Sequence, residues 1–169
     1  MALMTTVREA IQADLAESPG AVIEEVAKQH GVSPKDVLEL LPEAEVVAVD
    51  GAHFEAVMGE MTAWGEVTFL VNTGDVILEA KGVVPPGRMG QGYYNLHGKP
   101  IGGHLRASSC DQIAFVSRKL FESDTHSVQF YNRHGDCMFK VYLGRDAARR
   151  LIPEQVERFK AFRDRMAAE

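Results

Sequence analysis

The chain has 169 residues, of which 46% are hydrophobic and 25% charged, and its formal net charge at pH 7 is −6. This is the composition of an ordinary globular domain, so it excludes a collagen-like, coiled-coil or disordered chain. No apolar stretch approaches the roughly 20 residues that span a bilayer, and the N-terminus lacks the apolar segment of a signal peptide. We therefore expect a cytoplasmic protein without a membrane partner.

Three short helices are predicted within the first 45 residues. Thr5 or Thr6 caps the first helix, Gly31 ends the second, and the third begins after Ser33 and ends before Pro42. Followed by the apolar run at 46–49, this order resembles a winged helix-turn-helix. Residues 1–50 hold three basic and ten acidic side chains, however, and DNA readers are basic. We favour a helical cap that packs on a sheet, and expect no nucleic-acid partner.

Strand signals dominate the remainder of the chain. A helix is expected over 54–64, and a helical tail follows Arg145, with Pro153 in its first turn. The predicted strands cover 67–71, 76–80, 91–97, 101–108, 112–120, 126–132 and 137–143. The fold class is therefore α+β: an N-terminal helical bundle that is winged-helix-like, then an antiparallel β-sheet core, then a C-terminal helix. We divide the chain into a cap over 1–45 and a sheet domain over 46–169, folded as one compact unit.

The two cysteines, Cys110 and Cys137, fit neither a disulfide framework nor a thiolate metal site, so we expect buried, reduced thiols. The sequence contains no phosphate-binding loop, no His-Glu-x-x-His pair and no serine nucleophile elbow. These absences leave the usual hydrolase and nucleotide-binding classes without support.

A glycine-rich segment in the middle of the chain is the strongest functional signal. Seven of the chain's fifteen glycines fall within residues 82–103, which indicates either tight turns or a backbone that a flat ligand approaches closely. Residues 80–150 carry eleven Lys or Arg and five Asp or Glu, which favours an anionic ligand there.

The same segment holds side chains that can ligate iron, with cations nearby that suit carboxylates. In a regular strand Tyr94 faces away from Tyr93 and His97. Each such side chain alone is more often packed in a core or solvated than bound to a metal. The set is Tyr93, Tyr94, His97 and His104, with Arg88, Lys99 and Arg106 around them.

Two runs in this segment, Gly92-Tyr-Tyr-Asn-Leu-His-Gly-Lys99 and Gly103-His-Leu105, resemble the ChuX/HutX family of intracellular heme-utilisation carriers. The similarity extends over about residues 5–165. Its further matches are Leu40-Leu-Pro42, Trp64-Gly-Glu-Val-Thr68, Asp75-Val-Ile-Leu-Glu79, Val141-Tyr-Leu-Gly-Arg-Asp146 and Gln155-Val156.

The resemblance implies a cytosolic protein that binds heme and hands it to a heme-degrading or heme-storing partner. It also implies a homodimer whose paired sheets resemble a two-repeat protein. We expect no catalytic turnover. A heme-degrading enzyme of related fold and a heme-responsive transcription regulator remain alternative interpretations, and the front helices could also serve as a dimerisation element.

The resemblance further implies two candidate iron ligands, Tyr94 in the Gly-aromatic-aromatic motif and His104 in the Gly-His-hydrophobic step. It leaves two options open: Tyr94 as the main ligand, or His104 alone or together with Tyr94. Neighbouring cations would favour the phenolate form of the tyrosine. Asn72 stands where some members have a ligating histidine, so a bis-histidine site at that position is not expected. His97 is a further candidate on chemistry and proximity alone. The candidates for the heme propionates, on charge and proximity, are Arg88, Lys99 and Arg106.

Overall fold

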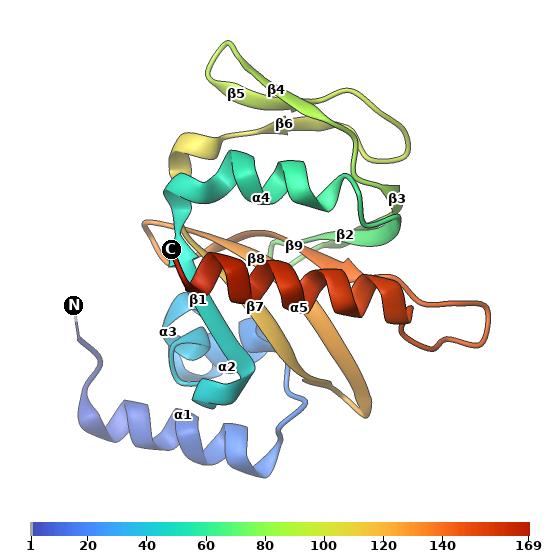
Figure 1. Cartoon of the computed structure of the whole chain (residues 1–169). Coiled ribbons are helices and arrows are strands. Elements are labelled where there is room, and N and C mark those ends of the chain that lie inside the picture. Colours follow the sequence, from blue (N-terminus) through green and yellow to red (C-terminus); the bar gives the residue numbers. More distant parts are fainter. Residues whose placement is uncertain (1) are drawn as a thin grey trace.

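The computed structural model describes residues 2–169, which form two antiparallel sheets and five α-helices (Figure 1). The helices are α1 (Thr5–Glu17), α2 (Ile23–His30), α3 (Pro34–Leu38), α4 (Phe54–Met61) and α5 (Pro153–Ala167). The strands are β1 (Val46–Asp50), β2 (Glu66–Asn72), β3 (Ile77–Val83), β4 (Gly87–Gly90), β5 (Tyr93–Leu96), β6 (Gly103–Leu105), β7 (Cys110–Leu120), β8 (Ser123–Asn132) and β9 (Cys137–Leu143). None of the helices in residues 2–169 is long and apolar enough to cross a membrane.

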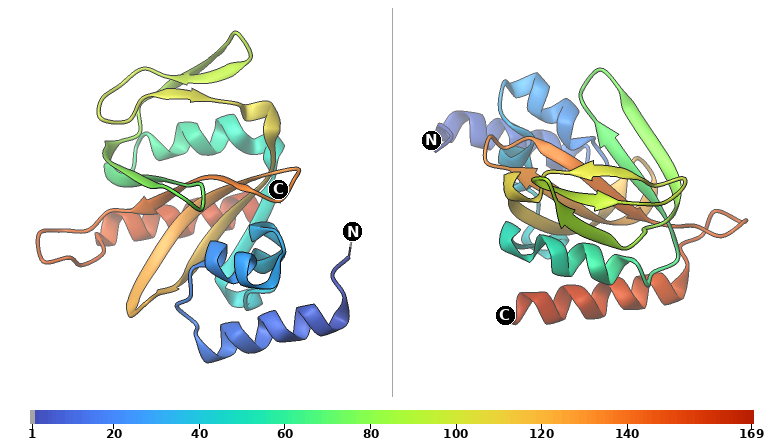
Figure 2. Two further views of the ribbon diagram at one scale, coloured as in Figure 1. Left: turned by 180° about the vertical axis from the view of Figure 1, so that it is seen from behind. Right: turned by 90° about the horizontal axis from the view of Figure 1, so that it is seen from above.

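The large sheet has the strand order β1-β7-β8-β9-β2-β3, and the small sheet has the order β4-β5-β6. Helices α4 and α5 cover one face of the large sheet, and the small sheet lies beyond α4 (Figures 1 and 2). Aromatic side chains fill the space between these layers. Phe54 of α4 packs edge-on against Phe130 and Phe139 of the large sheet and also against Tyr94 of the small one. Helix α4 thus joins the two sheets into one hydrophobic core.

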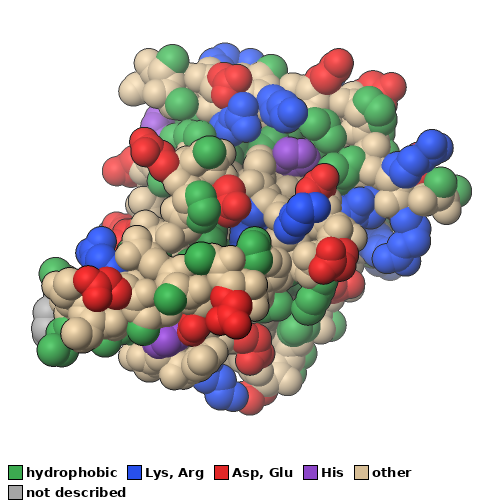
Figure 3. Space-filling model, turned by 90° about the horizontal axis from the view of Figure 1, so that it is seen from below, with side chains coloured by type: hydrophobic (Ala, Val, Ile, Leu, Met, Phe, Trp, Pro, Cys, Tyr) green, Lys and Arg blue, Asp and Glu red, His purple; other side chains and the backbone are tan. Residues whose placement is uncertain are grey.

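The N-terminal helices cover the opposite face of the large sheet at its β1-β7-β8 end. Ile11 of α1 and Val37 of α3 are fully buried there, in a second cluster with Val116 and Tyr131 of the sheet. The clusters follow from strand alternation, because consecutive residues of β7 face opposite sides. Seen from below, acidic side chains gather over these helices, and Lys and Arg gather over the loop between β9 and α5 (Figure 3).

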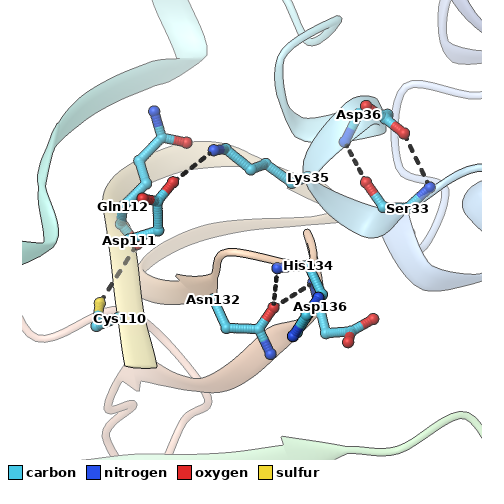
Figure 4. Close-up of polar contacts among 9 residues, drawn as sticks. All are labelled: Ser33, Lys35, Asp36, Cys110, Asp111, Gln112, Asn132, His134 and Asp136. Atoms are coloured by element: carbon cyan, nitrogen blue, oxygen red, sulfur yellow. Dashed lines mark hydrogen bonds and ion pairs between the residues drawn. The ribbon is translucent and has the colours of Figure 1, made fainter. Parts of the chain in front are cut away.

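Helix α3 is fixed to the large sheet by a cluster of polar contacts at its N-terminus (Figure 4). Ser33 and Asp36 form a capping box, which satisfies free N–H groups in the first turn. The backbone N–H of Lys35 donates to the carbonyl of Gly135 in the β8–β9 turn, and its ammonium lies 2.9 Å from Asp111 of β7. A side chain at Gly135 would collide with Ser33, since an added Cβ would lie 2.4 Å from Oγ.

Two charged side chains of the sheet reach the segment that contains α2. Lys140 of β9 and Glu24 of α2 are buried as an ion pair with a separation of 2.6 Å. Arg118 of β7 donates to the carbonyls of Pro19 and Ala21. Because breaking a buried ion pair leaves an uncompensated charge, these contacts fix the position of the cap.

The α+β class, the antiparallel core and the C-terminal helix are confirmed. The winged-helix-like bundle is not confirmed, since the segment over 2–45 forms only short helices that pack on the sheet. Two of the differences from the sequence pattern concern the small sheet. The strand at Gly87–Gly90 was not predicted, because it follows Pro85-Pro86 and is half glycine, and the strand predicted over 101–108 shortens to Gly103–Leu105.

Candidate functional site

The small sheet carries most of the predicted site residues, and its register sorts them into two faces. Arg88, Asn95 and His104 are directly opposite one another on β4, β5 and β6, so their side chains share the outer face. Tyr94 and Leu96 of β5 point to the inner face, where both are buried against the core. The site is therefore divided by strand alternation within the Gly92–Lys99 motif.

Asn95 determines which nitrogen of His104 is protonated. Its amide Nδ2 donates to the carbonyls of Arg88, Gly90 and Tyr93, at 3.1 to 3.2 Å, so its Oδ1 is an acceptor. That oxygen lies 2.6 Å from Nδ1 of His104, which must then carry the proton. The imidazole is exposed, and its Nε2 keeps a lone pair for a metal.

Tyr93 and Arg106 complete the outer face beside His104. The guanidinium of Arg106 lies over the Tyr93 ring at 4.5 Å from its centroid and donates to the phenol oxygen at 2.5 Å. The Tyr93 ring meets His104 edge-on at 6.0 Å between centroids. A histidine, a tyrosine and two arginines thus lie together on an exposed surface, a set that suits iron and carboxylate groups.

Tyr94 lies on the other side of the same sheet. Its residue is 4% exposed, and its ring packs edge-on against Phe54 at 5.6 Å. Burial raises the pKa of the Tyr94 phenol, Glu55 raises it further, and a hydrogen bond with the Gly87 backbone opposes them. In this conformation Tyr94 and His104 cannot both bind one iron.

The remaining predicted residues lie away from this arrangement. His97 and Lys99 are exposed in the loop between β5 and β6, where they line a shallow hollow. Asn72 is at the end of β2 in the large sheet, and its Oδ1 accepts from the backbone N–H of Gly74. The structure therefore brings together Arg88, His104 and Arg106, and leaves the other candidates apart from them.

One residue of the outer face, Asn95, was missed as a contributor by the sequence analysis, which quoted it only as part of the motif. Tyr93 was named among the side chains that can ligate iron. Period-two alternation along Tyr93-Tyr-Asn95 places both on one face and could have identified Asn95. The register that brings Asn95 to His104 has no comparable signal in the sequence. Within residues 2–169 there is no group of three or more His, Cys, Asp or Glu that could hold a metal ion.

The chain also shares its fold with a larger protein. It aligns with the crystal structure of ChuS, an E. coli heme oxygenase, with a TM-score of 0.71 over 93% of this chain and 47% of that one. The sequence identity is 14%, so this likeness concerns the fold alone.

Nearer relatives match in sequence as well. The profile of the family described as "Haem utilisation ChuX/HutX" matches residues 47–162. The intracellular heme transport protein HutX of Vibrio cholerae serotype O1 is 36% identical over 160 residues, which cover 94% of this chain and 83% of HutX. The solved structure of the heme-binding protein ChuX is 38% identical and superimposes with a TM-score of 0.83, covering 92% of this chain and 97% of ChuX. The chain therefore belongs to the ChuX/HutX family of haem-utilisation proteins.

Proposed function

We propose that the protein is a cytoplasmic heme carrier, which binds heme reversibly and passes it to a downstream heme-degrading or heme-storing protein. One observation carries the proposal: an exposed histidine, His104, whose Nδ1 proton is fixed by Asn95 and whose Nε2 makes no hydrogen bond with any residue over 2–169. Membership of the family and the names of its relatives HutX and ChuX support the choice of heme as the cargo.

In this proposal Nε2 of His104 binds the iron, and Arg88 and Arg106 contact the propionates. Two glycines of the segment border open space. Apart from its chain neighbours, a Cβ added at Gly92 or Gly103 would meet no heavy atom of residues 2–169 within 4 Å. His97 and Lys99, in the adjoining loop, contribute at the margin of the ring.

Tyr94 stays a predicted iron ligand, either as the main ligand or together with His104. To reach the iron its ring would have to leave its packing against Phe54 and lose a phenol proton that burial retains. His104 needs neither change, so we assign the iron in the first instance to His104.

An exposed site suits transfer better than catalysis. A heme on the outer face of the small sheet stays open to solvent and to an acceptor protein. The experiment is to load the full-length protein with hemin, add a reductant under oxygen and follow the Soret band. The carrier proposal expects saturation near one heme per chain and no linear tetrapyrrole product. Steady formation of such a product would support the enzyme interpretation, and no saturable binding would refute both.

The edge strand β3 supports the expected homodimer. It carries the exposed side chains of Ile77, Leu78 and Val83, at 61%, 66% and 52%, beside Val76 at 55%. Unprotected apolar edges of this kind pair with another chain. We expect light scattering to give twice the chain mass, and Leu78→Asp to lower it. A monomeric wild type would refute the homodimer.

A further inference from the structure

Helix α5 crosses the large sheet near the β7–β8 hairpin, and the tip of the hairpin extends beyond the helix (Figure 1). A half-buried histidine without a role in the proposed function lies between them. His126 of β8 is directly opposite Ser117 of β7, and the Ser117 hydroxyl oxygen lies 2.7 Å from Nδ1 of His126. The His126 ring packs on Phe159 of α5, with 5.2 Å between the ring centroids. The imidazole is therefore held from two sides, by a hydroxyl group and by the helix.

The two flanks of α5 face different neighbours. Phe159 points into the core between them. On one flank Arg165 lies 3.6 Å from Glu60, so this flank faces α4. Because a helical turn takes 3.6 residues, Lys160 and Arg163 lie on the other flank, toward the β7–β8 hairpin and His126.

The charged groups that act on His126 are mostly cations. Burial lowers the pKa of the imidazole, and Lys160 and Arg163 lower it further. Arg145, in the loop after β9, acts in the same direction, and Asp124 of β8 opposes these effects. The imidazole is therefore neutral at pH 7.

The carboxylates of this corner leave part of the positive charge uncompensated. Asp124 lies 3.4 Å from Lys119 of β7, and Asp164 lies 2.9 Å from its neighbour Arg163, both carboxylates being largely exposed. Exposed ion pairs of this kind are weak. Lys160 has no ion-pair partner within residues 2–169. A chain with a formal net charge of −6 thus keeps a local excess of cations here.

The donors of this corner suit an oxyanion. When the Ser117 hydroxyl donates to Nδ1 of His126, the ring proton is on Nε2, where it can be donated to a ligand. The guanidinium of Arg163 and the ammonium of Lys160 add donors that carry charge. Phosphate offers more acceptor oxygens than a carboxylate does, so it matches this set of donors better.

We propose that the corner between α5 and the β7–β8 hairpin is a binding site for inorganic phosphate, held by Arg163 and Lys160 with Nε2 of His126 as a hydrogen-bond donor. None of these residues belongs to the small sheet, which carries the proposed heme site. The two proposals are therefore independent, and the phosphate site is tested without heme.

The probe is inorganic phosphate, titrated into the full chain at pH 7 with the ionic strength held constant by NaCl. Histidine side-chain resonances in NMR spectra report the binding. The His126 resonance should shift to saturation, and the pKa of His126 should rise, because a bound anion stabilises the imidazolium. His134, exposed in the β8–β9 turn, should show no saturable shift and is the internal reference.

Arg163→Gln tests the site, and Arg158→Gln is its matched control. Both variants remove one positive charge from α5, but Arg158 lies on the flank that faces α4. We expect the phosphate Kd to rise about tenfold in Arg163→Gln and to change by less than about twofold in Arg158→Gln. Lys160→Gln, at an exposed position, is the second test variant and should raise the Kd as well.

Three results would overturn the proposal. The first is the absence of a saturable His126 shift in the wild type. The second is an equal shift of His126 and His134, which would show non-specific binding. The third is a phosphate Kd that Arg163→Gln and Lys160→Gln raise no more than Arg158→Gln does, which would reduce the effect to overall charge.

Discussion

Gly87 of β4 has no room for a side chain, because the Tyr94 ring occupies the space beside it. A Cβ added at Gly87 would lie 2.1 Å from Cε2 of Tyr94, 2.2 Å from Cζ and 2.7 Å from the hydroxyl oxygen. The ring cannot yield by a few tenths of an ångström, since it is 4% exposed and packed edge-on against Phe54. Gly87→Ala must therefore displace the ring or separate β4 from β5.

The loss of unfolding free energy in Gly87→Ala should lie between that of an overpacked core and that of a deleted aromatic side chain. Overpacking costs about 1–3 kcal/mol, and removal of a buried aromatic ring about 3–5 kcal/mol. We expect Gly87→Ala to lower the free energy of unfolding by about 2–4 kcal/mol. Gly90→Ala, on the same strand, should change it by less than about 0.5 kcal/mol, because the nearest atom to its Cβ is Nδ2 of Asn95 at 3.4 Å.

Urea unfolding of Gly87→Ala, Gly90→Ala and the wild type measures both changes in the free energy of unfolding. A double-mutant cycle with Tyr94→Leu separates the clash from a general loss of strand pairing. Once the ring is absent, Gly87→Ala should cost at least about 1 kcal/mol less than in the wild type. A Gly87→Ala variant as stable as Gly90→Ala, or strict additivity in the cycle, would refute the placement of Tyr94 in the core.

Further predictions concern a buried ion pair, a buried thiol and the partner of His104. Lys140→Met should lower the free energy of unfolding by about 3–5 kcal/mol, because the Glu24 carboxylate stays buried without its partner. Adding Glu24→Leu should restore most of the lost stability. A smaller loss in Lys140→Met, measured by urea unfolding, would contradict this. Burial raises the pKa of the Cys110 thiol to about 12, so the folded chain keeps a proton that the unfolded chain loses above about pH 9. Stability should be insensitive to this thiol below that pH and fall by up to about 1.4 kcal/mol per pH unit between about 9 and 12, with a shallower slope in Cys110→Ala. Asn95→Leu should raise the hemin Kd about tenfold without changing the type of spectrum, and a Kd within twofold of the wild type would argue against its role in orienting His104.

Much of this arrangement follows from local sequence rules. Period-two alternation predicts that Tyr93 and Tyr94 face opposite sides, and the structure confirms it. Capping residues and glycine predict α2 and α3, since Gly31 takes the left-handed conformation and Ser33 caps with its side chain.

Other features depend on contacts between distant segments. Which tyrosine is buried depends on Phe54 of α4, about forty residues earlier in the chain, so no local pattern identifies Tyr94 as the core residue. The division into two sheets depends on β4. The sequence does not predict this strand, because it is half glycine and follows two prolines. The positive φ of Phe121, in the tight turn between β7 and β8, was not predicted either, because Phe-Glu is not a turn signal.

We propose that Nε2 of His104 binds the heme iron. The absorption and electron paramagnetic resonance spectra of the ferric heme complex in the wild type, His104→Ala and Tyr94→Phe test this assignment. We expect His104→Ala to change the iron spectrum and weaken binding, and Tyr94→Phe to leave both unchanged. A spectrum that changes in Tyr94→Phe and not in His104→Ala would contradict it, and would show that the buried tyrosine leaves the core to bind the iron.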